Sequence, residues 1–188
     1  MPLPIESTDN FTLEDYYNLP DDVRAEFIEG KIYYMASPTQ EHQEISGEVF
    51  RRIANYIAEK GGPCKVLTAP FDVKVNENKD DIVQPDIIVV CDPQKLDGKK
   101  CNGAPNWIIE IASPSIITND YVRKLKLYKE AGVEEYWIIN PEEKTIVVYE
   151  FNNKNGETVS EYSFENRVKP SIYEDFVIDF KEVSEIVY

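Results

Sequence analysis

Residues 84–128 read QPDIIVVCDPQKLDGKKCNGAPNWIIEIASPSIITNDYVRKLKLY, and this stretch decides the fold that the sequence predicts. It holds two short apolar runs, each with one acid: Asp86 opens the first run and Glu110 lies inside the second. Runs of Ile and Val that are apolar on both faces are typical of central strands. A stretch with helical spacing follows and carries Lys124. We therefore expect two neighbouring buried strands that each contribute an acid, and a helix that brings a lysine to them.

Two acids on neighbouring strands predict a site for a divalent cation. Strand side chains alternate between the two faces, so Asp86 can point to the same side as Glu110. Buried carboxylates repel one another and lose hydration, and a cation removes that cost. Oxygen ligands suit Mg²⁺ or Mn²⁺, with retained waters and substrate phosphate in the remaining positions. The backbone carbonyl of Ile111 is the candidate third ligand.

Lys124 is the candidate for a third catalytic group. It shares one helical stripe with Asp120 and Tyr128, at spacing i, i+4 and i+8. If this stripe faces the sheet, the ammonium can orient an attacking water or neutralise charge that develops on phosphorus. Plainer interpretations stay open: Asp86 can simply begin a strand and Glu110 can be structural. Lys124 can also pair with Asp120 across one helical turn.

The rest of the chain predicts an α/β fold with a mixed sheet. Periodicity and turn residues indicate a short helix over 7–18 that begins with a capping box at Thr12, and a hairpin around Glu29-Gly30. A long amphipathic helix runs from Pro38-Thr39 to Gly61-Gly62. Further strands are expected over about 64–75, 82–92, 106–113, 134–140, 141–151 and 157–164. A second helix over 120–132 should turn Val122, Leu125 and Tyr128 inward, and the tail at 171–183 adds an edge strand or a short helix.

The length and net charge of the chain limit the classes of function that it can have. A chain of 188 residues suits one domain with a full core, and we expect a single domain over residues 1–188. The net charge of −15 argues against a general nucleic-acid binder, because phosphate contacts need Lys and Arg. It leaves room for a nuclease with a local basic rim. Candidates for such a rim are Lys95, Lys99, Lys100, Arg123, Lys126 and Lys129, with a solvated loop as the equal alternative.

The termini and cysteines predict a cytoplasmic protein without a membrane segment. No run approaches the ~18 apolar residues of a membrane helix, and the N-terminal residues lack the pattern of a signal peptide. The three cysteines, Cys64, Cys91 and Cys101, follow no metal-binding spacing. We expect them to be reduced and to serve as small buried hydrophobes.

Several stretches together resemble a known family. They are FIEGKIYYMASPTQEHQEI (27–45), VQPDIIVV (83–90), GAPNWIIEIASPS (103–115), DYVRKLKLY (120–128) and AGVEEYWIINP (131–141). The chain is similar over roughly residues 11–150 to the Uma2 family of restriction-endonuclease-like proteins, within the PD-(D/E)XK nuclease superfamily. The resemblance implies a three-layer core in which a mixed central sheet is flanked by helices. It also implies hydrolysis of DNA phosphodiester bonds with Mg²⁺ or Mn²⁺.

The site that the resemblance implies departs from the superfamily pattern at one position. Pro85-Asp86 matches the first acid and Glu110 the second, but Ala112 stands where the usual lysine is expected. The family's own pattern moves the lysine to the following helix, where Lys124 matches it. Ala112 shares a strand face with Glu110, and its small side chain leaves room for a lysine from elsewhere.

Three further residues are secondary candidates beside Asp120 and Tyr128. Glu26 can contact the metal through water, or it can be a solvated hairpin acid. His42 near the start of the long helix can bind phosphate or tune the site, or it can cap and pack. Gln84 can bond to a metal-bound water or a base.

The leading hypothesis is a metal-dependent endonuclease that acts on DNA, in which Asp86 and Glu110 bind the metal and Lys124 assists attack. The first alternative is a catalytically idle member of the fold that serves as a binding or assembly module. The second alternative is a metal-dependent hydrolase that acts on small phosphoesters. A homodimer is the expectation for a small nuclease that must address both strands.

Overall fold

The computed structural model describes residues 10–76, 79–113, 118–151 and 156–187, and within helix α3 it leaves out the side chains of residues 118–120. Its centre is a six-stranded sheet in the order β11-β10-β9-β8-β6-β3. The bounds are β3 Lys65–Thr68, β6 Ile87–Val90, β8 Trp107–Ile111, β9 Glu135–Asn140, β10 Thr145–Glu150 and β11 Thr158–Ser163. β8 and β9 are parallel and the other neighbours are antiparallel, so the sheet is mixed as expected.

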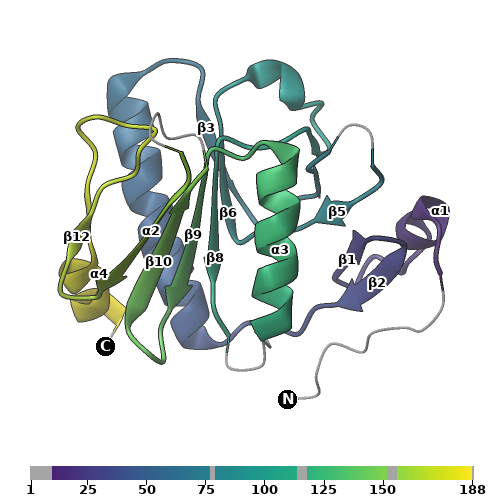
Figure 1. Ribbon diagram of the computed structural model, residues 1–188, viewed down its shortest axis with the longest axis horizontal. Coiled ribbons are helices and arrows are strands. Elements are labelled where there is room, and N and C mark those ends of the chain that lie inside the picture. Colours follow the sequence, from purple (N-terminus) through teal and green to yellow (C-terminus); the bar gives the residue numbers. More distant parts are fainter. Residues whose placement is uncertain (1–9, 77–78, 114–117, 152–155, 188) are drawn as a thin grey trace.

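Two helices cover the two faces of this sheet and make three layers (Figure 1). Alternation along the strands sends Ile87, Trp107 and Ile109 to the face that packs against α2, Gln40–Lys60. It sends Ile88 and Ile108 to the opposite face, under α3, Thr118–Ala131. Both faces of the central strands are therefore buried, which is why their sequences are apolar throughout.

The long helix follows its sequence signals closely. Thr39 caps α2 by accepting a hydrogen bond from the His42 amide, and Gly61 ends it with a positive φ of 67°. Ile45, Val49 and Ile53 are fully buried, as their helical spacing predicts.

A second sheet lies beside the first, in the order β2-β1-β5-β4-β7. Its strands are β1 Ala25–Ile28, β2 Lys31–Tyr34, β4 Val73–Lys74, β5 Ile82–Val83 and β7 Cys101–Asn102. β1 and β2 form the hairpin expected around Glu29-Gly30, where both residues have positive φ. In Figure 1 this hairpin lies beyond α3, away from α2.

Two strands expected as continuous are each divided between the sheets. The segment 64–75 splits into β3 and β4 around Pro70, and 82–92 splits into β5 and β6 around Pro85. Proline has no N–H to donate to a ladder, so each break falls where hydrogen bonding would have to stop. The second break puts Asp86 at the junction of the two sheets.

The remaining elements are short and lie mostly near the two ends of the chain. α1 spans Leu13–Tyr17, shorter than the 7–18 expected, with residues 7–9 outside the described ranges; the capping box at Thr12 is present. A short 3₁₀ turn, η1, spans Pro93–Lys95. The tail forms both a strand and a helix: β12 Arg167–Val168 pairs with β13 Ile178–Asp179, and α4 spans Phe180–Val187.

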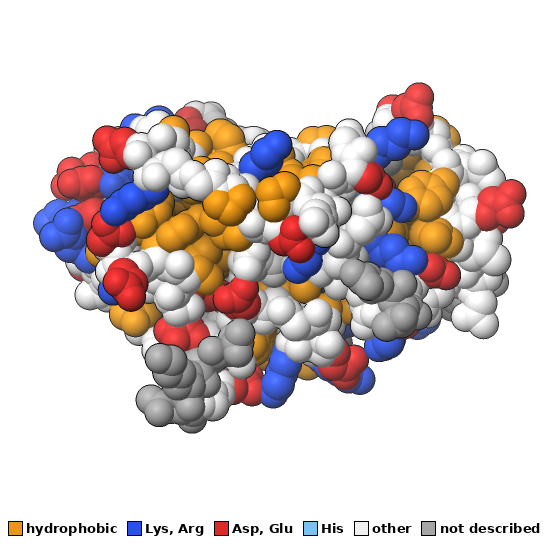
Figure 2. Space-filling view, turned by 90° about the horizontal axis from the view of Figure 1, so that it is seen from above, with side chains coloured by type: hydrophobic (Ala, Val, Ile, Leu, Met, Phe, Trp, Pro, Cys, Tyr) orange, Lys and Arg blue, Asp and Glu red, His pale blue; other side chains and the backbone are white. Residues whose placement is uncertain are grey.

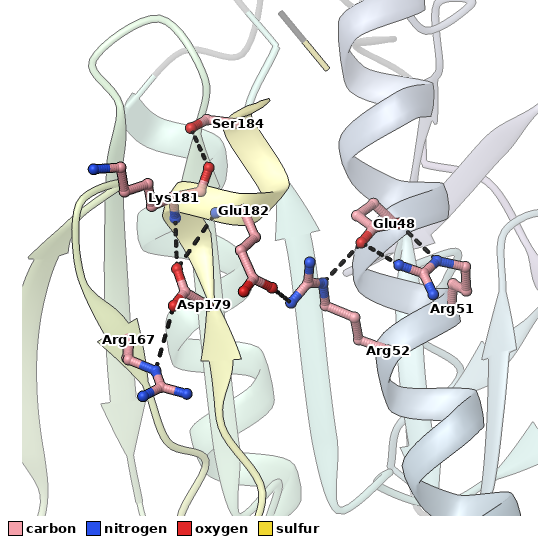
Figure 3. A network of polar contacts seen from close by, with 8 residues as sticks. All are labelled: Glu48, Arg51, Arg52, Arg167, Asp179, Lys181, Glu182 and Ser184. Atoms are coloured by element: carbon pink, nitrogen blue, oxygen red, sulfur yellow. Dashed lines mark hydrogen bonds and ion pairs between the residues drawn. The ribbon is translucent and has the colours of Figure 1, made fainter. Parts of the chain in front are cut away.

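Charged side chains join α4 to α2 (Figure 3). Arg52 on α2 donates to Glu182 on α4 at 2.9 Å and to Glu48 at 2.8 Å. Arg51 makes two further bonds to Glu48. These arginines are committed to structural ion pairs on the outer side of α2.

The inner face of α3 differs from the expectation. Val122 is 61% exposed, whereas Lys124, Leu127 and Tyr128 are buried. The prediction put Val122, Leu125 and Tyr128 inside; it is wrong for Val122, Leu125 is half-buried, and Tyr128 is buried as expected. Lys124 displaces Val122 because two carboxylates beneath the helix satisfy the buried ammonium, as described below.

The cysteine prediction is also wrong. Cys64 and Cys91 form a disulfide that closes a 27-residue separation, and Cys101 is free and buried. Cys64 precedes β3 and Cys91 follows β6, and the register pairs Lys65 with Val90, so the two cysteines lie opposite each other. Sequence spacing could not show this, because antiparallel pairing makes the contact.

Within the described ranges, no helix combines the length and apolar character that crossing a bilayer requires. The prediction of an α/β fold with a mixed central sheet flanked by helices is confirmed.

Candidate active site

Asp86 and Glu110 lie side by side where β6 begins and β8 ends. The antiparallel register pairs Ile87 with Ile109, and one step further it sets Asp86 opposite Glu110. Side chains opposite one another on antiparallel strands point to the same face. Asp86 Oδ2 also accepts a hydrogen bond of 2.8 Å from the amide of Ile111, which fixes the carboxylate against β8. The sequence-based placement of the two acids therefore holds.

Lys124 reaches this pair from α3. Its Nζ donates to Glu110 Oε1 and to Glu26 Oε1, each at 2.9 Å, and the residue is 4% exposed. Tyr128, one turn further along the helix, donates its hydroxyl to Glu110 Oε1 at 2.9 Å. The stripe that carries Lys124 and Tyr128 thus faces the sheet, and Ala112 leaves the strand face clear beside it.

Glu26 comes from β1 in the second sheet. Besides Lys124, its Oε1 accepts the amide of Gln84 at 3.0 Å. The side chain of Gln84 does not reach the carboxylate cluster, because its Nε2 donates to Asp72, which also accepts the hydroxyl of Tyr16. Gln84 therefore contributes its backbone, and Glu26 is a buried member of the cluster rather than a solvated hairpin acid.

His42 lies against Asp86 from the first turn of α2. Its Nε2 is 3.1 Å from Asp86 Oδ2, and since an ionised carboxylate only accepts, this nitrogen carries the proton. Burial lowers the pKa of His42, but the hydrogen bond and charge of Asp86, with Glu110 behind it, outweigh burial and leave the pKa raised. Nδ1 of the ring is buried and has no hydrogen-bond partner in the described part of the chain.

Glu110 is the carboxylate that its surroundings perturb most. Burial, then the charges of Asp86 and Glu26, raise its pKa to about 7 against the opposing effect of Lys124. Burial and the charge of Glu110 also raise the pKa of Tyr128 well above its ordinary value, so its hydroxyl stays a donor. The site is thus rich in negative charge that one ammonium only partly offsets.

These residues fit a hard divalent cation. The contacts of Asp86, Glu110 and Glu26 use one oxygen each, and in the described ranges the second oxygens accept no hydrogen bond from protein. Ile111 directs its N–H toward Asp86, and in an extended strand the carbonyl of the same residue points to that side as well. No three His, Cys, Asp or Glu side chains of the described residues group as a metal site by themselves. Two carboxylates, one carbonyl and water would complete an oxygen set of the kind Mg²⁺ takes.

Two further sequence-based predictions concern Asp120 and the basic rim. The side chain of Asp120 lies outside the described residues. Of the predicted stripe Asp120, Lys124 and Tyr128, the structure therefore describes the side chains of Lys124 and Tyr128. The expected basic rim is not a continuous surface: Lys126 pairs with Glu130, Lys129 pairs with Glu157, and Lys95 bonds to a backbone carbonyl. On the face drawn in Figure 2, Lys and Arg side chains are interspersed with Asp and Glu.

The sequence reasoning missed Arg24. It stands two residues before Glu26 on the extended chain that enters β1, and Met35 donates its amide to the Arg24 carbonyl. The available signal was the period-2 spacing from Glu26, which puts both side chains on one face.

Comparison with known proteins identifies the family of the chain. The family model Uma2, described as "Putative restriction endonuclease", matches residues 13–181. The chain belongs to the Uma2 family. A crystal structure titled as a putative nuclease belonging to DUF820, from Anabaena variabilis, superposes with a TM-score of 0.77 at 21% identity, over 95% of this chain and 99% of that one. This likeness shows that the two share a fold.

One curated relative of this Uma2 protein is the uncharacterized protein slr1290 of Synechocystis sp.. The two are 24% identical over 156 residues, which cover 82% of this chain and 80% of the relative. The family description supports a nuclease at a coarse level.

Proposed function

We propose that this Uma2 protein is a Mg²⁺- or Mn²⁺-dependent endonuclease that hydrolyses phosphodiester bonds of DNA. The single observation that carries the proposal is the meeting of Asp86, Glu110 and Lys124 from two strands and a helix. Buried Glu110 and part-buried Asp86 beside one lysine are costly without a function, because each desolvated charge must be compensated. The description of the Uma2 family supports a nuclease at a coarse level.

Each residue has a distinct role in the proposed reaction. Asp86, Glu110 and the Ile111 carbonyl would hold the cation, which when bound lowers the pKa of a coordinated water and polarises the phosphate. Lys124 orients the attacking water or neutralises charge on the phosphoryl oxygens. Glu26 and Tyr128 position Lys124 and Glu110 through the hydrogen bonds they already make.

His42 is a positioning residue in this scheme. Its Nε2–H holds one oxygen of Asp86, and the amide of Ile111 holds the same oxygen. Both bonds leave Oδ1 of Asp86 to face a cation. Second contacts of this kind typically matter 10- to 100-fold for metal affinity or activity.

Cleavage of supercoiled plasmid DNA tests the proposal. The parent should nick or linearise DNA with Mg²⁺ or Mn²⁺ and not in chelator. Glu110→Gln and Asp86→Asn should lose activity to background, and Lys124→Met should lose roughly 10²- to 10⁴-fold. Glu182→Gln changes an exposed acid of α4 and should cut like the parent. A Glu110→Gln protein that cuts as fast as the parent would overturn the mechanism.

A binding or assembly module without catalysis is the second candidate, and one observation favours it. Lys124 already pairs with two carboxylates, so a cation is not needed to hold the charge cluster together. This candidate predicts no metal-dependent cleavage of DNA or of small phosphoesters, and no stabilisation by millimolar Mn²⁺.

The proposed homodimer is tested separately. Light scattering measures the mass of the protein in solution, and the ratio of nicks to double-strand breaks shows whether both strands are cut together.

A further inference from the structure

Arg24 is a cation without a counter-ion among the residues that the structure describes. Its Nε is buried and has no hydrogen-bond partner, and its side chain enters no ion pair with the described residues. The residue as a whole is half-buried. Buried polar groups in native proteins are nearly always satisfied, and an exception calls for an explanation.

Each of the other described arginines has a partner for its positive charge. Arg51 and Arg52 bond to Glu48, Arg167 pairs with Asp179, and Arg123 lies 3.8 Å over the ring of Tyr33. Acidic residues outnumber basic ones by 35 to 20, so protein carboxylates are plentiful. Arg24 nevertheless has none, which points to a ligand from outside the chain.

Strand geometry puts Arg24 on the face of the candidate site. The β1–β2 ladder pairs Ala25 with Tyr34, and the bond from the Met35 amide to the Arg24 carbonyl extends it by one step. Arg24, Glu26 and Ile28 therefore share one face. Glu26 on that face contacts Lys124, and Ile28 packs in the core cluster that contains Leu127.

A second observation connects Arg24 with the carboxylate cluster. Arg24 and His42 lie near enough for their side chains to interact electrostatically. Arg24 is thus close enough to act on a group that itself touches Asp86. His42 Nδ1 is a second buried nitrogen without a partner among the described residues. Because Nε2 of His42 carries the ring proton, this Nδ1 is an acceptor, and of the two side chains only Arg24 can use its unpartnered nitrogen to donate to an anion.

We propose that Arg24 binds a non-bridging phosphate oxygen of the nucleic-acid backbone, beside the Asp86–Glu110 pair. The inference rests on the proposed nuclease function and adds the residue that receives the substrate. A guanidinium presents a planar fork of N–H donors that matches a phosphate in two-point contact. In a chain of net charge −15, one unneutralised arginine supplies the local attraction that a polyanion needs.

Sulfate binding tests the oxyanion site without requiring catalysis. Thermal unfolding of the full chain in MgCl₂ is compared in sodium sulfate and in sodium chloride of equal ionic strength. Sulfate should raise the midpoint of the parent and of Arg167→Gln, a control that removes an arginine exposed on β12 (Figure 3). Arg24→Gln should lose that extra rise, and without sulfate its midpoint should equal or exceed that of the parent. A rise in Arg24→Gln equal to the parent's overturns the proposal.

Nuclear magnetic resonance of the parent covers the case in which Arg24→Gln fails to fold. The Nε–Hε signal of Arg24, identified by its absence in Arg24→Lys, should shift on sulfate addition and saturate. A signal of the parent that stays in place overturns the proposal.

Binding of a fluorescein-labelled DNA duplex, with Ca²⁺ in place of Mg²⁺, then tells whether the anion is a phosphate of the nucleic-acid backbone or a free oxyanion. Arg24→Gln should weaken binding severalfold and reduce the slope of log K against log salt by about 1. Arg24→Lys should keep part of the parent's affinity for the duplex. The control variant Arg167→Gln should bind the duplex as tightly as the parent. If sulfate binds through Arg24 but the parent binds no DNA, the oxyanion site stands, while the nucleic-acid ligand and the nuclease function both fail.

Discussion

The ammonium of Lys124 lies 2.9 Å from the carboxylate of Glu26, although 98 residues separate them along the chain. The same ammonium is 2.9 Å from Glu110. Lys124 therefore joins three elements, α3, β1 and β8, and ties the second sheet to the first. A side chain that both neutralises the cluster and connects the sheets should show its effect in stability as well as in cleavage.

Replacing Lys124 by Met should destabilise the metal-free protein by about 3–5 kcal/mol, because two buried carboxylates lose their counter-charge. The double variant Lys124→Met/Glu110→Gln should lose less unfolding free energy than Lys124→Met alone, because one of the two unpaired buried carboxylates is removed. Urea unfolding in chelator measures both. A loss below about 1 kcal/mol in the single variant would show that the pair contributes little.

Stability in chelator should depend on pH through Glu110. Its pKa is raised from 4.5 to about 7, so the folded state holds this proton more tightly than the unfolded state. The unfolding free energy it contributes is fully present below about 4.5 and falls as pH rises to about 7, by an amount on the order of 3 kcal/mol. The difference between the parent and Glu110→Gln, measured by urea unfolding from pH 4.5 to 8, isolates it. A difference that is flat with pH contradicts the prediction.

Mn²⁺ should stabilise the parent by binding the folded state. At a concentration tenfold above the dissociation constant the gain is about 1.4 kcal/mol, or roughly 3–6 °C for a chain of this size. The shift should vanish in Asp86→Asn and remain in Glu182→Gln. Stabilisation of Asp86→Asn equal to that of the parent would locate the cation elsewhere.

The Cys64–Cys91 disulfide predicts that one thiol, that of Cys101, reacts in denaturant before reduction and three after it. Closing a 27-residue separation should contribute about 3–4 kcal/mol, by restricting the unfolded chain. The variant Cys64→Ser/Cys91→Ser, unfolded beside the parent with and without reductant, measures this contribution. Three reactive thiols in the unreduced parent would refute the pairing.

Local signals in the sequence anticipated the elements whose residues act on near neighbours. The Thr39 cap, the Gly61 stop and the hairpin at Glu29-Gly30 each depend on backbone geometry within a few residues. The two divided strands could not be anticipated in this way. Pro70 and Pro85 mark the breaks, but only the partners on either side decide that the chain changes sheets there.

The periodicity of the chain was enough to indicate the two acid-bearing strands and the helix that carries Lys124. The packed structure was needed to show that Asp86 and Glu110 share a face and that Lys124, in place of Val122, turns inward. It also showed that Glu26 and His42 join the cluster, and that Arg24 has no partner among the described residues. The physical reason is that a buried charge is tolerated only where partners from distant elements meet it. Those partners are known once the sheets and helices have packed.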